Sequence, residues 1–318
     1  MTEKILEILE SENGYISGEK ISGELGISRN AVWKHINKLR KDGYEIESVT
    51  NRGYRLTGKK DIISAEIIKD NLGTEFIGQN VVYYDEIDST NNAAKRESAM
   101  PDGTLFISEA QTSGKGRLGR SWSSAKGDGI WMSLLLKPDL KPEQVSQITL
   151  VAGMAAAAAV GNGAKIKWPN DIVIGTKKIC GILTEMSAEI ERVNYVVCGI
   201  GINVNTASFE KELDNKATSL YIETGKRYNR TDIIRHTLVN FERLYKIFCR
   251  HGIGVLLDEY RKQCITLNRE VSIIYNNETF IGKAVDIDGE GNLIVEANGE
   301  THTVHSGEVS VRGIYGYI

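Results

Sequence analysis

The sequence predicts a protein of the α/β (α+β) class, with an N-terminal helical unit, a central mixed β-sheet with packed helices, and a small C-terminal β-barrel. Three observations support this prediction. Short amphipathic helices begin the chain, β-like runs outnumber helices in its centre, and apolar and polar residues alternate from Leu267 to Arg312. With 318 residues, the chain is long enough for roughly two domains of about 150 residues each.

Composition excludes several classes of protein. The chain carries 39 Lys and Arg against 42 Asp and Glu, a net charge of −3, and 41% of its residues are hydrophobic. That balance excludes a disordered chain, a coiled-coil rod and a strongly basic histone-like protein. The acidic N-terminus does not resemble a signal peptide, and the longest apolar stretch, residues 148–160, is shorter than the roughly 20 residues of a membrane span. The four cysteines are widely spaced without a C-x-x-C pair, so we expect a cytoplasmic protein with reduced thiols and no membrane contact.

The N-terminal part of the chain is charged unevenly. Residues 1–25 hold two Lys and Arg against six acidic residues, whereas residues 26–60 hold nine against three. A basic stretch in a mildly acidic protein is a candidate nucleic-acid surface. Charge alone is also consistent with an ordinary solvated face.

Helix signals in this region sharpen the interpretation. Ser17 can cap a second short helix that ends at Gly26, and Ser28 can cap a third. Two short helices joined by a tight turn are typical of a helix-turn-helix. We expect Trp33 to pack at the rim of the third helix. Arg and Asn side chains read guanine and adenine edges in a major groove. The side chains expected to face DNA are Ser28, Arg29, Asn30, Lys34, His35 and Arg52.

A hairpin follows the third helix. Two β-like runs between Tyr44 and Leu56 flank a turn that contains Asn51 and Gly53, both turn-forming residues. This hairpin predicts a wing, and with the preceding helices it completes a winged helix-turn-helix. The alternative is a winged helix that is used only for protein contacts.

The centre of the chain alternates strand-like and helix-like runs. The strand-like runs are residues 81–84, 104–109, 130–136, 165–168, 172–174, 178–186 and 195–203. The helix-like runs are residues 91–98, 142–161, 231–250 and 254–264. Because strands often follow one another directly, a mixed sheet covered by helices fits better than a doubly wound fold.

A glycine-rich loop, Gly114–Arg120, is the main chemical feature of this region. It matches G-x-G-x-x-G, but no β-α-β unit follows it and no G-K-[ST] ends it, so neither a dinucleotide fold nor a Walker loop is predicted. Glycines let backbone N–H groups approach an anion, and Lys115, Arg117 and Arg120 add charge-assisted hydrogen bonds. The alternative is an exposed basic loop without a ligand.

Further polar clusters lie at the ends of the predicted strands. Lys167–Asp171 combines an aromatic residue, an amide and a carboxylate, which suits a nucleobase or substrate pocket, although it could also be a simple turn. Strand alternation puts Lys178 and Cys180 on one face of a predicted strand. Asp88–Asn91 caps a helix with hydroxyl groups that could bind a polar ligand.

Taken together and in this order, these blocks resemble those of the bifunctional biotin–protein ligases and biotin-operon repressors of the BirA type, over nearly the whole chain. The blocks are Asp88–Asn91, Gln111, Gly114–Arg120 with Trp122, Lys167–Asp171, Lys178 with Gly181, and Gly199–Val204. The resemblance implies a synthetase-like ligase domain of the class II aminoacyl-tRNA synthetase type, followed by an SH3-like cap. It implies three domains: residues 1–62, 63–266 and 267–318.

The same resemblance implies an ATP-dependent reaction with biotin and Mg²⁺. Biotin becomes biotinyl-5′-AMP and is then transferred to a lysine of a biotin carboxyl carrier protein. The biotin contacts would be Ser89, Thr90, Asn91, Gln111, Gly114, Lys115, Arg117, Lys178 and Gly181. The ATP and adenylate contacts would be Arg117, Arg120, Trp122, Asn170, Lys178 and Arg312, the last being equally consistent with a surface arginine. The catalytic residues would be Arg117, Lys178 and Asp171, with Asp171 contacting a metal or orienting the acceptor lysine.

One departure from the family pattern concerns Lys115, because the family loop often has an arginine there. Lysine keeps the charge but loses the bidentate fork, so we expect activity to survive, whereas the substitution leaves the retention of the adenylate open. The resemblance also implies that the adenylate acts as a corepressor, favouring a homodimer that binds operator DNA. Three alternatives stay open: a sensor without ligase activity, a lipoate-type ligase or transferase, and a monofunctional biotin ligase with a vestigial winged helix.

Overall fold

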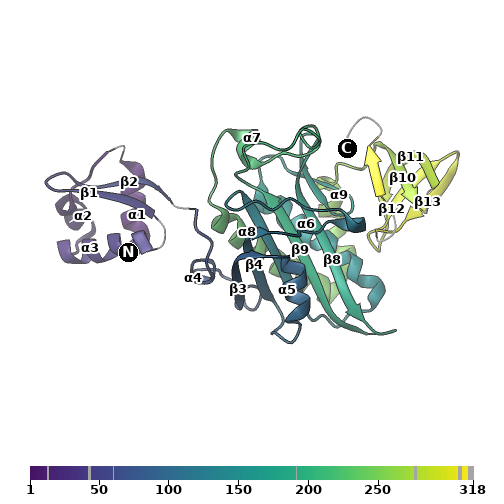
Figure 1. Ribbon diagram of the computed structural model, residues 1–318, viewed down its shortest axis with the longest axis horizontal. Helices are drawn as coiled ribbons and strands as arrows, with labels where there is room; N and C mark the ends of the chain where they lie inside the picture. The colour runs from purple at the N-terminus through teal and green to yellow at the C-terminus, as the bar shows by residue number, and fades with distance from the viewer. Residues whose placement is uncertain are drawn as a thin grey trace. The chain divides into compact units, whose positions relative to one another are not determined.

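The computed structural model describes residues 1–12, 14–41, 44–59, 61–190, 192–275, 278–306 and 310–313. The chain forms two compact units, Met1–Ile62 and Ile63–Ile318 (Figure 1). Within the described residues, every helix is too short or too polar to cross a membrane.

The N-terminal unit is the predicted winged helix-turn-helix. Its elements are α1 (Thr2–Ser11), α2 (Gly18–Leu25), α3 (Arg29–Lys41), β1 (Tyr44–Val49) and β2 (Gly53–Lys59). The hydroxyl of Ser17 accepts a hydrogen bond from the backbone N–H of Lys20, and Gly26 ends α2 with φ +65°. The hydroxyl of Ser28 accepts from the N–H of Ala31. These contacts confirm the predicted caps, because each satisfies a backbone group that a helix end leaves without a partner.

The second unit contains a mixed seven-stranded sheet in the order β3-β4-β5-β9-β8-β7-β6. Its strands are β3 (Val81–Ile87), β4 (Thr104–Gln111), β5 (Gly129–Leu136), β6 (Lys165–Lys167), β7 (Asp171–Ile174), β8 (Lys177–Ala188) and β9 (Val193–Asn203). The β3–β4 pair is parallel and the other neighbours are antiparallel. Each strand overlaps a predicted run, and the mixed sheet is confirmed.

Helices cover both faces of this sheet (Figure 1). They are α4 (Ala65–Lys69), α5 (Thr90–Arg96), α6 (Val145–Val160), α7 (Leu220–Thr224), α8 (Arg230–His251) and α9 (Leu257–Gln263). Two of them, α4 and α7, were not predicted, because five residues are too few to show a helical period. Short 3₁₀ turns occupy Arg117–Gly119, Pro142–Gln144 and Ile253–Leu256.

Strand alternation divides the sheet into two faces. Met132, Leu134 and Ile200 point into the large core with α6 and α8. Leu135 and Val197 point the other way and pack against Ala93 and Ala94 of α5. Because α5 is short, it covers only part of its face, and the remainder is free to form a site.

The C-terminal residues form a five-stranded antiparallel, SH3-like sheet in the order β13-β12-β11-β10-β14. Its strands are β10 (Glu270–Tyr275), β11 (Glu278–Ile287), β12 (Leu293–Ala297), β13 (Glu300–Val304) and β14 (Ser310–Gly313). Val271, Ile273 and Val295 belong to the same hydrophobic core as α6 and α8. The indole Nε1 of Trp168 donates to the carbonyl of Gly291 at 3.0 Å, which ties this sheet to the end of β6.

Candidate active site

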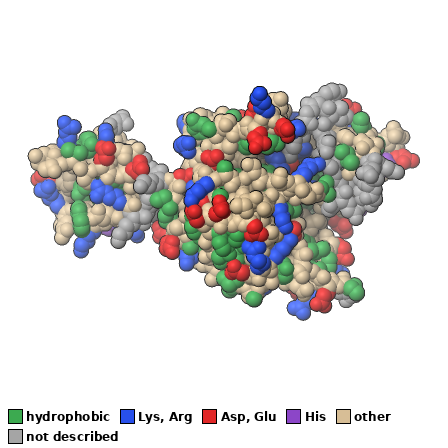
Figure 2. Space-filling model, in the orientation of Figure 1, with side chains coloured by type: hydrophobic (Ala, Val, Ile, Leu, Met, Phe, Trp, Pro, Cys, Tyr) green, Lys and Arg blue, Asp and Glu red, His purple; other side chains and the backbone are tan. Residues whose placement is uncertain are grey.

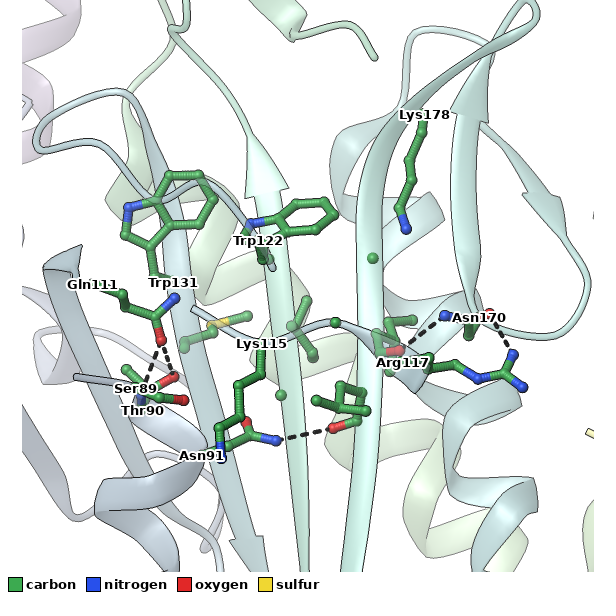
Figure 3. Close-up of a pocket in the computed structure, with 18 residues that line it drawn as sticks. Ser89, Thr90, Asn91, Gln111, Lys115, Arg117, Trp122, Trp131, Asn170 and Lys178 are labelled. Atoms are coloured by element: carbon green, nitrogen blue, oxygen red, sulfur yellow. Dashed lines mark hydrogen bonds between the residues drawn. The ribbon is translucent and has the colours of Figure 1, made fainter. Parts of the chain in front are cut away.

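A pocket lies on the α5 face of the central sheet, over β5, β8 and β9 and beneath the glycine-rich loop (Figure 3). The predicted site residues that line it are Ser89, Thr90, Asn91, Gln111, Lys115, Arg117, Trp122, Asn170, Lys178 and Gly181. The fold therefore brings together side chains that lie up to about 90 positions apart in the sequence.

The bottom of the pocket is a network of polar side chains, all buried except the half-buried Gln111. We call it the pocket floor: Thr90, Asn91, Gln111, Ser124 and Ser133. The backbone N–H of Thr90 donates to Gln111 Oε1 at 2.8 Å, and Gln111 Nε2 donates to Ser124 Oγ at 2.8 Å. Ser133 Oγ lies 2.7 Å from Thr90 Oγ1 and 2.6 Å from Asn91 Oδ1. Each of these residues thus hydrogen-bonds to another residue of the floor, and these contacts fix the directions of their donors and acceptors.

The cations of the glycine-rich loop contact other parts of the unit. Lys115 Nζ donates to Asn92 Oδ1 at 2.8 Å. Arg117 donates through Nη1 to Asn170 Oδ1 at 2.9 Å and through Nη2 to the carbonyl of Ser306 at 2.6 Å. Burial lowers the pKa of Arg117, and the nearby charge of Asp171 opposes that effect. A partly desolvated guanidinium gains more than an exposed one from an anionic ligand.

Asn92 connects Lys115 to an ion pair on α5. Asp88 Oδ2 accepts from Asn92 Nδ2 at 2.7 Å, and both Asp88 oxygens accept from Arg96 at 2.9 and 3.0 Å. The Arg96 hydrogen bonds, opposed by desolvation and supported by Asn92, hold the pKa of Asp88 well below its usual range. The carboxylate is therefore ionised near neutral pH and fixes the amide that orients Lys115.

Lys178 reaches the pocket from the other side. Its Nζ lies 2.5 Å from Asp171 Oδ1 and 5.0 Å from the centre of the Trp122 ring. Trp122 lies over the sheet between Trp131 and Lys178 (Figure 3), with the two indole rings in an edge-to-face arrangement at 6.4 Å. A Cβ at Gly201 would lie only 2.7 Å from Trp122 Nε1. The glycine thus makes room for an aromatic platform, which suits the stacking of a planar ligand.

Some predicted site residues lie outside the pocket lining. Gly114 is buried beneath the loop, where a Cβ would lie 2.3 Å from the carbonyl oxygen of Trp122; it lets two stretches of backbone meet. Arg120 is exposed, and Asp171 takes part through its ion pair with Lys178. Arg312 lies on β14, and its side chain is outside the described residues.

One expectation about a strand face was wrong. A β-bulge shifts the pairing, because Ile172 faces Cys180 whereas Val173 faces Lys178. Cys180 therefore points into the core while Lys178 lines the pocket, although simple alternation put them on one face. In the Lys167–Asp171 block, Asn170 lines the pocket, whereas the aromatic residue Trp168 is 1% exposed and belongs to the core.

No cluster of three or more His, Cys, Asp or Glu side chains suited to a metal ion occurs among the described residues. The carboxylate in the pocket region that was considered as a metal contact, Asp171, is paired with Lys178. The part of the chain that the structure describes therefore contains no metal-binding cage of its own.

Known proteins resemble the whole chain. A bifunctional ligase/repressor BirA from Bacillus spizizenii is 43% identical, over 93% of this chain and 94% of its own length. The bifunctional ligase/repressor BirA of Escherichia coli is 28% identical over 97% of this chain and 96% of its length. The chain belongs to the BirA family of biotin–protein ligases. Three family models match parts of the chain. The HTH domain matches residues 2–55, the biotin/lipoate A/B protein ligase family matches residues 83–203, and the biotin protein ligase C-terminal domain matches residues 266–312.

A solved structure supports the family assignment. The biotin protein ligase from Aquifex aeolicus, determined in complex with biotin and ATP, is 30% identical and superposes with a TM-score of 0.66. It covers 74% of this chain and 99% of its own residues. Nearly all of the Aquifex aeolicus chain therefore matches this one, whereas about a quarter of this chain has no counterpart in it.

The winged helix of this BirA-family chain presents a polar face on α3. Arg29, Asn30 and Lys34 are exposed, as expected for side chains that could reach DNA. His35 is half-buried, with Nδ1 2.9 Å from Thr2 Oγ1. Trp33 is 52% exposed, so the expectation that it packs at the rim was wrong.

Other charges of the N-terminal unit complete this surface. Lys and Arg side chains are spread over its visible face (Figure 2). Ser28 and Arg52 are exposed, Ser28 at the start of α3 and Arg52 at the hairpin turn. Arg55 instead pairs with Glu47 at 2.8 Å on the wing.

The structure adds site residues that sequence reasoning missed in this BirA-family protein. They are Ser124, Trp131, Ser133, Glu185 and Asn92. Four of them lie within predicted strands or helices of ordinary composition, so no local sequence pattern identified them as site residues. Gly199 and Gly201 were part of the resemblance, and their spacing of two could have indicated one bare stripe on a strand face.

Proposed function

We propose that this protein is an ATP-dependent biotin–protein ligase. It forms biotinyl-5′-AMP and transfers biotin to a lysine of a biotin carboxyl carrier protein. The observation that carries the proposal is a pocket with a neutral, fully bonded polar floor beneath a loop that carries Lys115 and Arg117. A cyclic urea suits the floor, and a carboxylate with a phosphate suits the cations.

In the first step a carboxylate oxygen of biotin attacks the α-phosphorus of ATP. A new oxygen–phosphorus bond forms, the bond to the β-phosphate breaks, and pyrophosphate leaves with the electron pair. Lys178, Arg117 and Lys115 surround this position and offset the negative charge that builds up there. Mg²⁺ would enter with ATP and neutralise its phosphates.

In the second step the acceptor lysine, as a free amine, attacks the carbonyl carbon of the adenylate. A carbon–nitrogen bond forms, the carbon–oxygen bond to phosphate breaks, AMP leaves with the electron pair, and the proton released by the nitrogen passes to solvent. Asp171 lies beside the reacting region, because its Oδ1 is 2.5 Å from Nζ of Lys178, which lines the pocket. We assign Asp171 to orienting the acceptor ammonium group before it loses its proton.

The decisive experiment combines the purified protein with biotin, ATP and Mg²⁺, with and without a biotin carboxyl carrier domain. Pyrophosphate release and the mass of the acceptor are measured. We expect one biotin-sized mass increase on one lysine. Biotin binding without pyrophosphate release would instead identify a sensor, and competition by free lipoate would support the lipoate-type alternative.

We also propose that the protein represses transcription of biotin-synthesis genes as an adenylate-bound homodimer. Exposed Arg29, Asn30 and Lys34 on α3 favour this second activity, as do the ligase/repressor relatives. A ligand that prefers the dimeric state increases DNA binding by linkage. Sedimentation and a DNA-binding assay on the promoter of the organism's biotin-synthesis genes, with and without adenylate, test it. Unchanged dimerisation and DNA affinity would leave a monofunctional ligase with a vestigial winged helix.

A further inference from the structure

A carboxylate outside the predicted site anchors the pocket floor. One oxygen of Glu185, on β8, accepts from Asn91 Nδ2 at 2.7 Å, and the other accepts from Lys95 Nζ at 2.5 Å. Asn91 Nδ2 also lies 3.3 Å from the carbonyl of Leu183. Because a carboxylate and a carbonyl can only accept hydrogen bonds, the amide nitrogen of Asn91 must point towards them.

This orientation determines where the next protons lie. The amide oxygen of Asn91 faces Ser133 Oγ at 2.6 Å, so the Ser133 proton must lie between them. Ser133 has a single hydroxyl proton, so the 2.7 Å contact between Ser133 Oγ and Thr90 Oγ1 then takes the proton of Thr90, in preference to Gln111 Oε1 at 3.2 Å. The hydroxyl of Thr90 is thereby used as a donor within the protein, and only its lone pairs remain for a ligand.

The opposite end of the floor is fixed independently. Ser124 Oγ donates to the carbonyl of Trp122 at 3.2 Å and so must accept from Gln111 Nε2. At the other end of the same amide, Gln111 Oε1 accepts a hydrogen bond from the backbone N–H of Thr90. Gln111 therefore cannot turn over to compensate for a change at Asn91.

We propose that Glu185 is a positioning residue that sets the hydrogen-bond polarity of the pocket floor, so that Thr90 presents an acceptor to a ligand N–H. The inference rests on the proposed function, because the ureido ring of biotin carries two N–H donors. A lipoyl ring or an octanoyl chain carries none. The polarity of the floor therefore contributes to the choice of biotin over these acids.

The charge state of Glu185 is consistent with this role. Partial burial raises its pKa, but the hydrogen bonds from Lys95 and Asn91 and the charges of Lys95 and Lys115 outweigh burial, and the pKa lies below its ordinary value. Glu185 is therefore a carboxylate near neutral pH, with two acceptor oxygens.

Glu185→Gln tests the proposal. Glutamine has one acceptor oxygen, for which Asn91 Nδ2 and Lys95 Nζ compete, and the charged lysine forms the stronger bond. The new NH₂ group then faces Asn91, whose amide turns over. Ser133 must donate to Thr90 instead, which occupies a lone pair of Thr90 that a ligand N–H would use, and the Thr90 proton turns towards Gln111 Oε1, 3.2 Å away. We expect the Kd for biotin, measured by calorimetry, to rise about tenfold, equivalent to ~1.4 kcal/mol. The KM for biotin should rise with it, while kcat at saturating biotin and the KM for ATP stay unchanged.

The double variant Lys95→Met/Glu185→Gln gives the matched control. Without the lysine charge, the glutamine oxygen is free to accept from Asn91, and we expect biotin affinity within about twofold of wild type. Lys95→Met alone keeps the carboxylate and should also bind normally. Thermal melting checks that each variant is folded.

Three outcomes would overturn the inference. Unchanged biotin affinity in folded Glu185→Gln contradicts it, and so does a double variant as weak as the single one, since a merely structural defect would not be rescued. A parallel fall in kcat and a rise in the KM for ATP would indicate general disruption of the site. Wild-type protein that fails to bind biotin would reject the proposed function itself, a result that needs no variant.

Discussion

The pocket floor and the glycine-rich loop recognise ligands in different ways. The floor is a set of mostly buried side chains that hydrogen-bond to one another, with Ser133 fully buried and Asn91 4% exposed. The two loop cations that line the pocket contact different parts of the unit: Lys115 reaches α5, whereas Arg117 reaches Asn170 and Ser306. The neutral part of a ligand meets a surface that is already formed. Its charged part meets side chains that must exchange partners when an anion arrives.

Lys178→Ala should give the largest effect, because it removes the cation at the junction of floor and loop. By analogy with oxyanion donors, we expect a loss of about 10²–10³ in the rate of adenylate formation. Pyrophosphate release under single-turnover conditions measures it. Lys177→Ala is the matched control, since Lys177 is the neighbouring residue on β8 and does not line the pocket. Equal losses in both variants would contradict the assignment.

Arg117→Ala should remove the charge recognition of the loop and leave the floor intact. We expect a folded protein that makes little adenylate or releases it faster, by about ten- to a hundredfold, since charge-assisted bonds contribute roughly 1.5–3 kcal/mol. Pyrophosphate release and adenylate dissociation are measured together. Arg120→Ala, an exposed position outside the pocket lining, should change both less. Unchanged values for Arg117→Ala would refute this role.

Gly199→Ala should damage the floor and leave the loop intact. A Cβ at Gly199 would lie 2.1 Å from Asn91 Oδ1, so Asn91 must move. We expect a loss of about 1–3 kcal/mol in the free energy of unfolding, typical of overpacking, and weaker biotin binding. Gly153→Ala in α6 is the control, because its nearest contacts would be 3.8 Å and alanine favours a helix. Denaturant unfolding should show Gly153→Ala to be neutral or stabilising.

Asp88→Asn should give the smallest effect and links the two regions through Asn92 and Lys115. Because the folded pKa of Asp88 is depressed, its stabilisation is present above the unfolded pKa of about 3.9 and disappears as pH falls through the folded pKa. The side chain is 37% exposed, so solvent screening limits the effect to about 1 kcal/mol or less at pH 7.

Urea unfolding of wild type and Asp88→Asn as a function of pH measures this difference, which should shrink as pH falls below about 4. Asp85→Asn is the control, since Asp85 and its partner Lys126 are 68% and 62% exposed. We expect no measurable change there. A difference that grows towards acidic pH would contradict the assigned sign.

Local patterns decided much of this fold before any tertiary contact. Ser17, Gly26 and Ser28 mark helix ends because the groups that they satisfy lie within a few residues. The central strands followed from short apolar runs with β-type composition. The sequence also predicts anion binding by the glycine-rich loop, because closely spaced glycines and cations favour that chemistry in any fold.

Local patterns therefore predict the order and type of the elements and the chemical character of the loop. The tertiary structure decided which side chains meet. Asn91 and Glu185 lie 94 positions apart and share a hydrogen bond, a bulge turns Lys178 away from Cys180, and Trp168 enters the core by packing near Gly291. Such contacts depend on strand pairing across the sheet, and register is set by the packing of whole faces rather than by neighbouring residues.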